Sequence, residues 1–151
     1  MIPRRERKSW RIKARCDRLI DEGYSRLQEK KFKEAIAAYT AALKFDPKVE
    51  IPTTDWNTLC WRGSLQKQAA DVLPACDKAV ALAPEDGNIR DRRGLARALT
   101  GDTQGAITDF EAYIAQTQDK ESKAQRQRWV KDLQAGKNPF TDAEIKKLQN
   151  Q

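Results

Sequence analysis

Hydrophobic residues recur every three or four positions in several separate stretches of the chain. The stretch from residue 33 to residue 45 has its apolar side chains at Ala35, Ile36, Tyr39, Ala42 and Leu43. Spacings of three and four place such side chains on one face of a helix. The pattern therefore predicts an amphipathic helix that buries one side and exposes the other.

The same pattern returns twice, and each amphipathic stretch follows another helical one. The second and third amphipathic stretches cover residues 70–82 and 104–116, and the preceding stretches cover residues 16–29, 55–67 and 88–99. Short breaks separate them, and Asp46-Pro47 and Ala83-Pro84 are stops because the residue before proline disfavours helical backbone. No stretch is typical of a strand. We therefore expect an all-α chain built from helix pairs.

Equivalent positions recur in the three helix pairs. A small residue in each first helix is followed twelve residues later by an aliphatic residue, and four residues further on by an aromatic residue or cysteine. The three sets are Gly23, Ala35 and Tyr39; Cys60, Val72 and Cys76; and Gly94, Ala106 and Phe110. Self-similarity at a fixed period is the signature of a repeat architecture.

This pattern resembles the tetratricopeptide repeat, which has about 34 residues in two antiparallel helices. The resemblance covers residues 16 to about 118 and includes Trp56-x-x-Leu59 in the middle copy. It implies a right-handed α-solenoid of antiparallel helix pairs. The chain departs from the family pattern at Cys60 in place of glycine, at Cys76 in place of an aromatic residue, and at Tyr113 and Gln118 in the last copy.

The resemblance also implies a division of the chain. We expect a basic helical extension at residues 1–15, followed by three repeats at residues 16–52, 53–86 and 87–120. A capping helix is expected at residues 121–135, and a C-terminal loop with a short helix at residues 136–151. Thr141-x-x-Glu144 has the spacing of a capping box that opens the last helix. Segments around Trp56–Trp61 and Asn138–Thr141 also resemble multidomain bacterial proteins that contain this repeat, cyanobacterial ones in particular.

In such a solenoid the first helix of each pair lines a concave groove. Helical spacing assigns nine residues to that groove, namely Tyr24, Gln28, Asn57, Trp61, Ser64, Asn88, Asp91, Arg92 and Leu95. Tyr24, Trp61 and Leu95 hold equivalent positions and are expected to form a ladder. Aromatic anchors in a concave surface favour peptide binding. The alternative is that Tyr24 and Trp61 pack as core residues.

The function expected from this resemblance is a non-catalytic adaptor that binds a peptide or helix of a protein partner. The best-known ligand mode of the family is a carboxylate clamp for acidic chaperone tails. Of the five clamp positions, which here are Ile20, Tyr24, Thr58, Asn88 and Arg92, only Arg92 matches the family. A groove with apolar and amide character is therefore expected instead.

Charge is concentrated at the N-terminus. The chain has a formal net charge of +7, and residues 1–20 contribute +6 of it. The basic residues assigned to an electrostatic contact are Arg4, Arg5, Arg7, Lys8, Arg11, Lys13 and Arg15. Three interpretations stay open: a solvated arm, a contact with nucleic acid or anionic lipid, and docking of an acidic protein. No known nucleic-acid-binding motif is present.

Composition narrows the chemistry further. The chain contains no histidine, which excludes histidine-based triads, Cys-His dyads and His-ligated zinc. The odd number of cysteines (Cys16, Cys60 and Cys76) and their spacing indicate neither a disulfide framework nor a zinc site, so we expect buried free thiols. We therefore expect no enzyme activity, metal or cofactor.

The remaining expectations concern location and assembly. No apolar run is long enough to span a membrane, and no secretory signal follows the basic N-terminus, so a reduced, cytoplasmic setting is expected. The chain is expected to be a monomer or a weak homo-oligomer. A self-associating structural module is a further alternative, because the ends of solenoids stack on each other.

Overall fold

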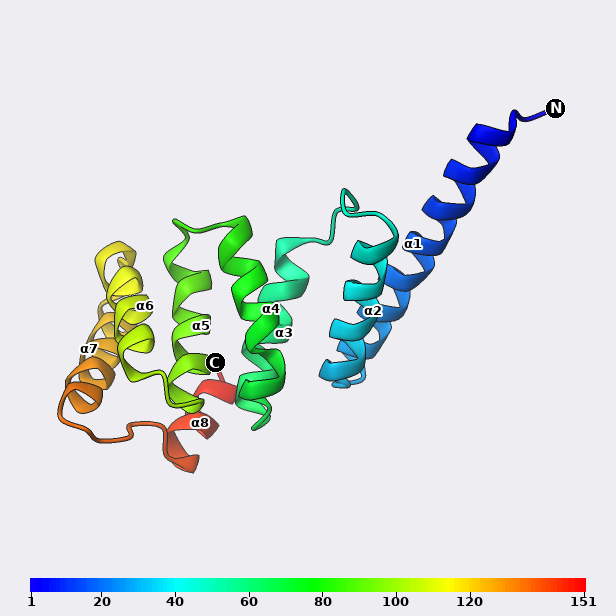
Figure 1. Ribbon diagram of the computed structural model, residues 1–151. Coiled ribbons are helices and arrows are strands. Elements are labelled where there is room, and N and C mark those ends of the chain that lie inside the picture. The colour runs from blue at the N-terminus through cyan, green and yellow to red at the C-terminus, as the bar shows by residue number, and fades with distance from the viewer.

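The computed structural model describes residues 1–151 and contains eight helices and no strand. The helices are α1 (Arg4–Gln28), α2 (Phe32–Phe45), α3 (Thr53–Leu65), α4 (Ala69–Leu82), α5 (Gly87–Leu99), α6 (Thr103–Gln116), α7 (Lys120–Gln134) and α8 (Asp142–Gln149). They stand side by side in a row, and α8 folds back beneath it (Figure 1). The expected all-α solenoid of antiparallel helix pairs is confirmed. None of the eight helices combines the length and the apolar character needed to cross a bilayer.

Acidic and hydroxyl side chains start the helices of the C-terminal half. Asp86, Asp102 and Asp119 accept hydrogen bonds from backbone N–H groups in the first turns of α5, α6 and α7. These groups have no partner inside the helix, so such caps stabilise its start. Thr141 caps α8 through the Glu144 N–H, but the Glu144 side chain contacts α7 instead of completing the expected capping box.

Two helix pairs are held by a glycine that lies against an aromatic ring. A β-carbon on Gly23 would lie 2.3 Å from Tyr39 of α2, and one on Gly94 would lie 2.9 Å from Phe110 of α6. Both distances are too short for any larger residue. Glycine is therefore required at these positions because the aromatic ring occupies the space of a side chain.

In the middle pair, a disulfide takes the place of the contact between a glycine and an aromatic ring. Cys60 of α3 and Cys76 of α4 occupy the positions of the glycine and the aromatic ring, at the same separation of 16 residues, and they are bonded to each other. Their Cα atoms are 4.8 Å apart. The expectation of free thiols at these two positions is therefore wrong, whereas Cys16 is a free buried cysteine as expected.

The buried apolar residues form two clusters. The first spans α1 to α5 and centres on Tyr39, Trp56 and Val72. The second joins the ends of α3 and α5 to α6, α7 and α8, and it includes Leu95 and Leu148. The second cluster therefore extends the core beyond the helix pairs and onto the side of the first helices.

Candidate interaction face

The candidate site lies on the side of the first helices α1, α3 and α5, which face away from their partners α2, α4 and α6. At its centre, the Arg92 guanidinium lies 5.4 Å from the centroid of the Trp61 ring. Trp61 is only partly buried and packs against the second core cluster. Burial lowers the pKa of Arg92, while the carboxylates of Asp91 and Asp86 oppose this effect. A cation over an indole face is a favourable contact that leaves the ring edge free for a ligand.

A cavity of about 520 Å³ opens beside Trp61. Its apolar walls come from three parts of the fold: Phe32 at the start of α2, Trp61 and Leu65 of α3, and Leu148 of α8. The other lining residues are polar, and they are Lys30, Arg62, Gln66, Gln149 and Gln151. A concave site that combines apolar walls with polar side chains is suited to ligand and peptide recognition.

Four other predicted groove residues stay accessible to solvent. Tyr24 of α1 is 53% exposed, and Gln28 and Asn88 are exposed as well. Asn57 of α3 is partly buried, and its side-chain oxygen has no hydrogen-bond partner. A buried acceptor without a partner is unfavourable until a donor reaches it. These residues, with Trp61 and Arg92, form what we call the open face.

The structure corrects the expectation for Ser64, Asp91 and Leu95, which are all buried. Leu95 has no exposed surface and belongs to the second core cluster. Asp91 accepts two hydrogen bonds from Arg126 of α7, at 3.0 and 2.8 Å. Ser64 is 1% exposed, and its hydroxyl has no hydrogen-bond partner. The expected ladder is therefore broken at Leu95, because later helices cover this part of the groove.

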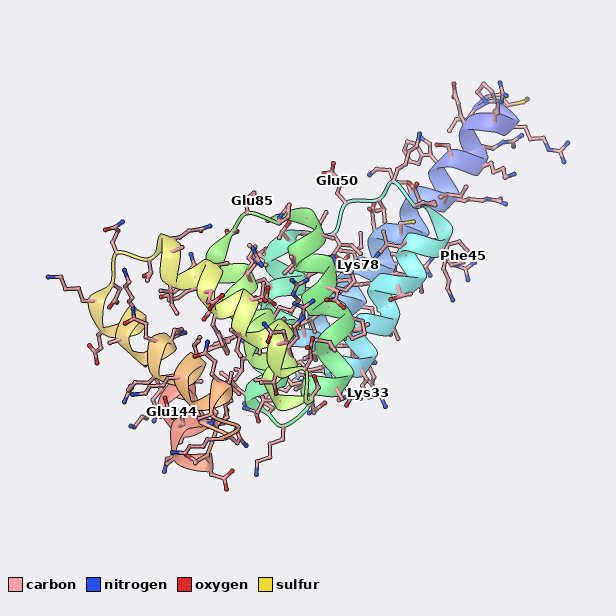
Figure 2. The ribbon with its side chains drawn as sticks, turned by 60° about the vertical axis from the view of Figure 1, so that its left-hand side comes forward. Lys33, Phe45, Glu50, Lys78, Glu85 and Glu144 are labelled. Atoms are coloured by element: carbon pink, nitrogen blue, oxygen red, sulfur yellow. A yellow bond between two sulfur atoms is a disulfide. The ribbon has the colours of Figure 1, made fainter.

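The C-terminal segment provides most of that cover. Leu148 of α8 packs in the second cluster, and the Gln149 amide donates a hydrogen bond to the Leu65 carbonyl at 2.8 Å. Glu144, which is labelled in Figure 2, accepts hydrogen bonds from the Trp129 indole and the Gln125 amide of α7, both at 3.0 Å. We call Ser64, Asp91 and Leu95, which α7 and α8 cover, the covered face.

The basic residues assigned to the N-terminal contact are all exposed on α1. They are Arg4, Arg5, Arg7, Lys8, Arg11, Lys13 and Arg15. Within this set, Lys13 forms the single ion pair, with Asp17 at 3.4 Å, and Arg15 lies 4.0 Å over the ring of Phe45. The structure therefore keeps them apart from the open face and leaves most of their charge unpaired.

The cysteines and carboxylates offer little for chemistry at these surfaces. The Cys16 thiol donates to the Ala42 carbonyl at 3.6 Å, and burial raises its pKa, with smaller effects from Asp46 and Asp17. No group of three or more histidine, cysteine, aspartate or glutamate side chains is placed to hold a metal ion.

Comparison with solved structures identifies related folds. The first tetratricopeptide-repeat domain of Spaghetti (RPAP3), bound to the HSP90 peptide SRMEEVD, is 21% identical, with a TM-score of 0.55 over 82% of this chain and 93% of that one. The corresponding domain of human RPAP3 is 23% identical (TM-score 0.56; 83% and 98% covered). The P58(IPK) domain is 16% identical (TM-score 0.60; 88% and 37% covered). No protein-family model and no curated protein sequence matches the chain.

Proposed function

We propose that this chain, which has the tetratricopeptide-repeat fold, is a non-catalytic adaptor that binds a peptide or short helix of a protein partner on its open face. The observation that carries the proposal is the partly buried Trp61, which lies under Arg92 and borders the 520 Å³ cavity. Tryptophan and arginine in a partly enclosed site are the residues that most often dominate binding energy. Tyr24 and Asn57 extend this surface toward α1.

The chemistry of the open face predicts the character of the ligand. The structurally similar RPAP3 domain holds an acidic peptide. Here the positions that the family uses to clamp carboxylates carry Ile20, Tyr24, Thr58 and Asn88, and Arg92 is the one cation among them. We therefore propose a ligand with one apolar anchor for the cavity beside Trp61. A single carboxylate or carbonyl of the ligand contacts Arg92.

A peptide-display selection tests this proposal and does not require the partner to be identified. Peptides selected on the wild-type chain are measured by fluorescence polarisation against Trp61→Ala and against Leu82→Ala. Leu82 is the matched control, because it is also an exposed large apolar residue, but it lies at the end of α4. We expect Trp61→Ala to weaken binding at least tenfold while far-UV helicity persists, and Leu82→Ala to change it less than twofold. Equal affinities for the wild type and Trp61→Ala would contradict the proposal.

A second candidate function uses the basic N-terminal helix to contact nucleic acid or an anionic surface. It is supported by the exposed and mostly unpaired cations of α1. Such binding would fall steeply with salt, because clustered cations release counterions from phosphates. A gel-shift titration with and without residues 1–15 tests it, and an unchanged shift after the deletion would remove it.

A self-associating role predicts sedimentation that depends on protein concentration.

The remaining parts of the proposal concern organisation and location. We propose three repeats, at residues 16–52, 53–86 and 87–120, and a capping helix at residues 121–135. We also propose that the chain comes from a bacterium. A cytoplasmic location requires the Cys60–Cys76 disulfide to persist in a reducing setting. Both residues are only 1% exposed, which limits the access of an attacking thiol. Counting free thiols in the protein isolated from its source tests whether this disulfide persists there.

A further inference from the structure

The N-terminal part of α1 projects beyond its partner helix. α1 has 25 residues and α2 has 14, so α1 continues for eleven residues, or about 16 Å, past the length of its partner. The pair closes near Cys16, whose thiol contacts the Ala42 carbonyl, and Arg15, which lies over Phe45 at the end of α2. Figure 1 shows this end of α1 standing clear of the row of helices. We call residues 4–14 the overhang.

A cavity of about 600 Å³ lies between the overhang and the end of α2. Its apolar lining consists of Ile12 and Cys16 from α1 with Phe45 and Val49 from α2 and the following loop. Phe45 is 42% exposed although it is a large aromatic side chain. The cavity therefore lies beyond the C-terminal end of α2. It exposes apolar side chains that a longer α2 would have covered.

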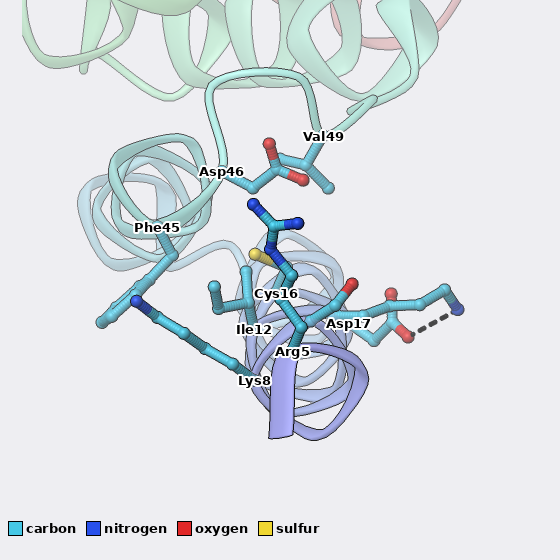
Figure 3. Close-up of a pocket in the computed structure, with 10 residues that line it drawn as sticks. Arg5, Lys8, Ile12, Cys16, Asp17, Phe45, Asp46 and Val49 are labelled. Carbon is cyan, nitrogen blue, oxygen red and sulfur yellow. Dashed lines mark hydrogen bonds and ion pairs between the residues drawn. The ribbon is translucent and has the colours of Figure 1, made fainter. Parts of the chain in front are cut away.

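Positive charge borders this apolar lining. Arg5 and Lys8 take part in no ion pair, and Figure 3 shows Lys8 reaching toward Phe45 and Arg5 toward Asp46. Of the two carboxylates at the cavity, Asp17 is paired with Lys13, and Asp46 accepts a hydrogen bond from the Lys48 backbone N–H at 3.0 Å and keeps its negative charge. Arg5, Lys8 and Lys13 outnumber these two carboxylates, so the lining of the cavity has a net charge of +1.

We propose that the overhang and the end of α2 form a second docking site, which takes an acidic amphipathic helix from another protein. The apolar stripe of that helix covers Ile12, Phe45 and Val49, and its carboxylates face Arg5 and Lys8. A helix in this position lies against α1 as a continuation of α2. The site is separate from the open face and does not depend on the function proposed there.

The cavity favours a protein helix over the other anionic partners. A nucleic-acid backbone is recognised by cations alone and gains nothing from an apolar recess. An amphipathic helix at a bilayer surface needs a polar face rich in cations and an apolar face that meets the lipid. Here Trp10, the most exposed aromatic residue, lies on another side of α1 from Ile12, beside Glu6 and Asp17 around the helix. Of these three partners, only an acidic amphipathic helix uses both the positive charge of the overhang and the apolar lining of the cavity.

The test uses the full chain and a fluorescein-labelled 18-residue peptide with leucine at helical spacing of three and four and glutamate elsewhere. A peptide of the same composition with scrambled spacing is the probe control. The test variant is Arg5→Glu/Lys8→Glu, which reverses the two unpaired cations that line the 600 Å³ cavity. The matched variant is Arg7→Glu/Arg11→Glu, which carries the same charge change at two residues that do not line this cavity, in a neighbouring basic recess that shares Lys8 with it.

We expect the patterned peptide to bind at least tenfold more tightly than the scrambled one. Arg5→Glu/Lys8→Glu should weaken binding at least tenfold, the matched variant less than threefold, and Trp61→Ala not at all. Equal losses in the two charge variants, or equal binding of the two peptides, would overturn the proposal because diffuse charge attraction would explain them. A DNA duplex or phosphatidylserine vesicles that bind more tightly than the patterned peptide would also overturn it.

Discussion

The open and covered faces of the solenoid are built from the same side of the same kind of helix. Tyr24 and Leu95 hold equivalent repeat positions, yet Tyr24 is 53% exposed and Leu95 is completely buried. The difference arises outside the repeats, because α7 and α8 cover the end of the row at α5, and nothing covers α1. A repeat position therefore determines which way a side chain points, and the rest of the chain determines whether it meets solvent.

The two faces also differ in how they are held. The covered face is fixed by the buried ion pair between Asp91 and Arg126, an indole hydrogen bond and Leu148, and residues 120–151 take part in all three contacts. The open face is fixed from behind, by the Cys60–Cys76 disulfide and by Tyr39 packed against Gly23. Substitutions of these anchors separate the two faces experimentally.

The largest effect is expected at the buried pair of the covered face. Arg126→Met leaves the Asp91 carboxylate buried without its partner, which should lower the free energy of unfolding by about 3 to 5 kcal/mol. Urea unfolding followed by circular dichroism measures the loss. The double variant Asp91→Leu/Arg126→Met is the control and should recover most of it. A loss below about 1 kcal/mol in the single variant would show that the pair does not hold the covered face.

The disulfide behind the open face comes next. Cys60→Ala/Cys76→Ala removes a cross-link between residues 16 positions apart, which should cost about 3 kcal/mol. Adding a reductant to the wild type should lower its stability in thermal unfolding and leave the variant unchanged. A wild type that responds to reductant no more than the variant would mean that the bond contributes nothing to stability.

Leu148→Ala should loosen the covered face more locally. Truncation of this buried side chain should cost about 2 to 3 kcal/mol, most of it in the attachment of α8. Hydrogen–deuterium exchange should then accelerate in residues 142–149 and stay unchanged in α1 and α2. Lys146→Ala, at an exposed position of the same helix, is the matched control. Equal acceleration in α2 would show that the two faces unfold together.

The smallest effect is expected from the Tyr39 hydroxyl, which donates a 2.7 Å hydrogen bond to Asp55. Burial and this hydrogen bond raise the pKa of Tyr39 well above its ordinary value. Unfolded tyrosine ionises at about pH 10, so the stabilisation is complete below that pH and is lost as the pH rises above it. Tyr39→Phe should cost about 1 kcal/mol at neutral pH, and its stability should fall less than that of the wild type between about pH 10 and 11.

The repeat pattern predicts the helix pairs because small and aromatic residues recur at fixed spacing, and packing requires that spacing. The same alignment places Cys60 where the other copies have glycine and Cys76 where they have an aromatic ring, so it sets the two residues face to face. The number and spacing of the cysteines do not indicate the disulfide when they are considered without that alignment. The positions of Cys60 and Cys76 within the repeat are the signal that does.

The covered face could not be predicted in the same way. Ile145 and Leu148 show that the last helix has an apolar side. The apolar side of an eight-residue helix does not determine which surface of the protein it packs against. The partners of α8 lie up to 84 residues away, as in the bond between Gln149 and Leu65. Such contacts depend on the path of the loop at residues 135–141, which no repeat constrains.

The central claim is that the open face binds the partner while α8 stays in place over the covered face. Hydrogen–deuterium exchange of the chain with and without a selected peptide tests this directly. The account predicts slower exchange in residues 20–28 and 56–62, where Tyr24 and Trp61 lie, and no faster exchange in residues 142–149, whose Leu148 and Gln149 line the cavity beside Trp61. Protection of α4 or of residues 36–45 in α2 would contradict it, and faster exchange in α8 would show that the peptide displaces α8 and binds the covered face instead.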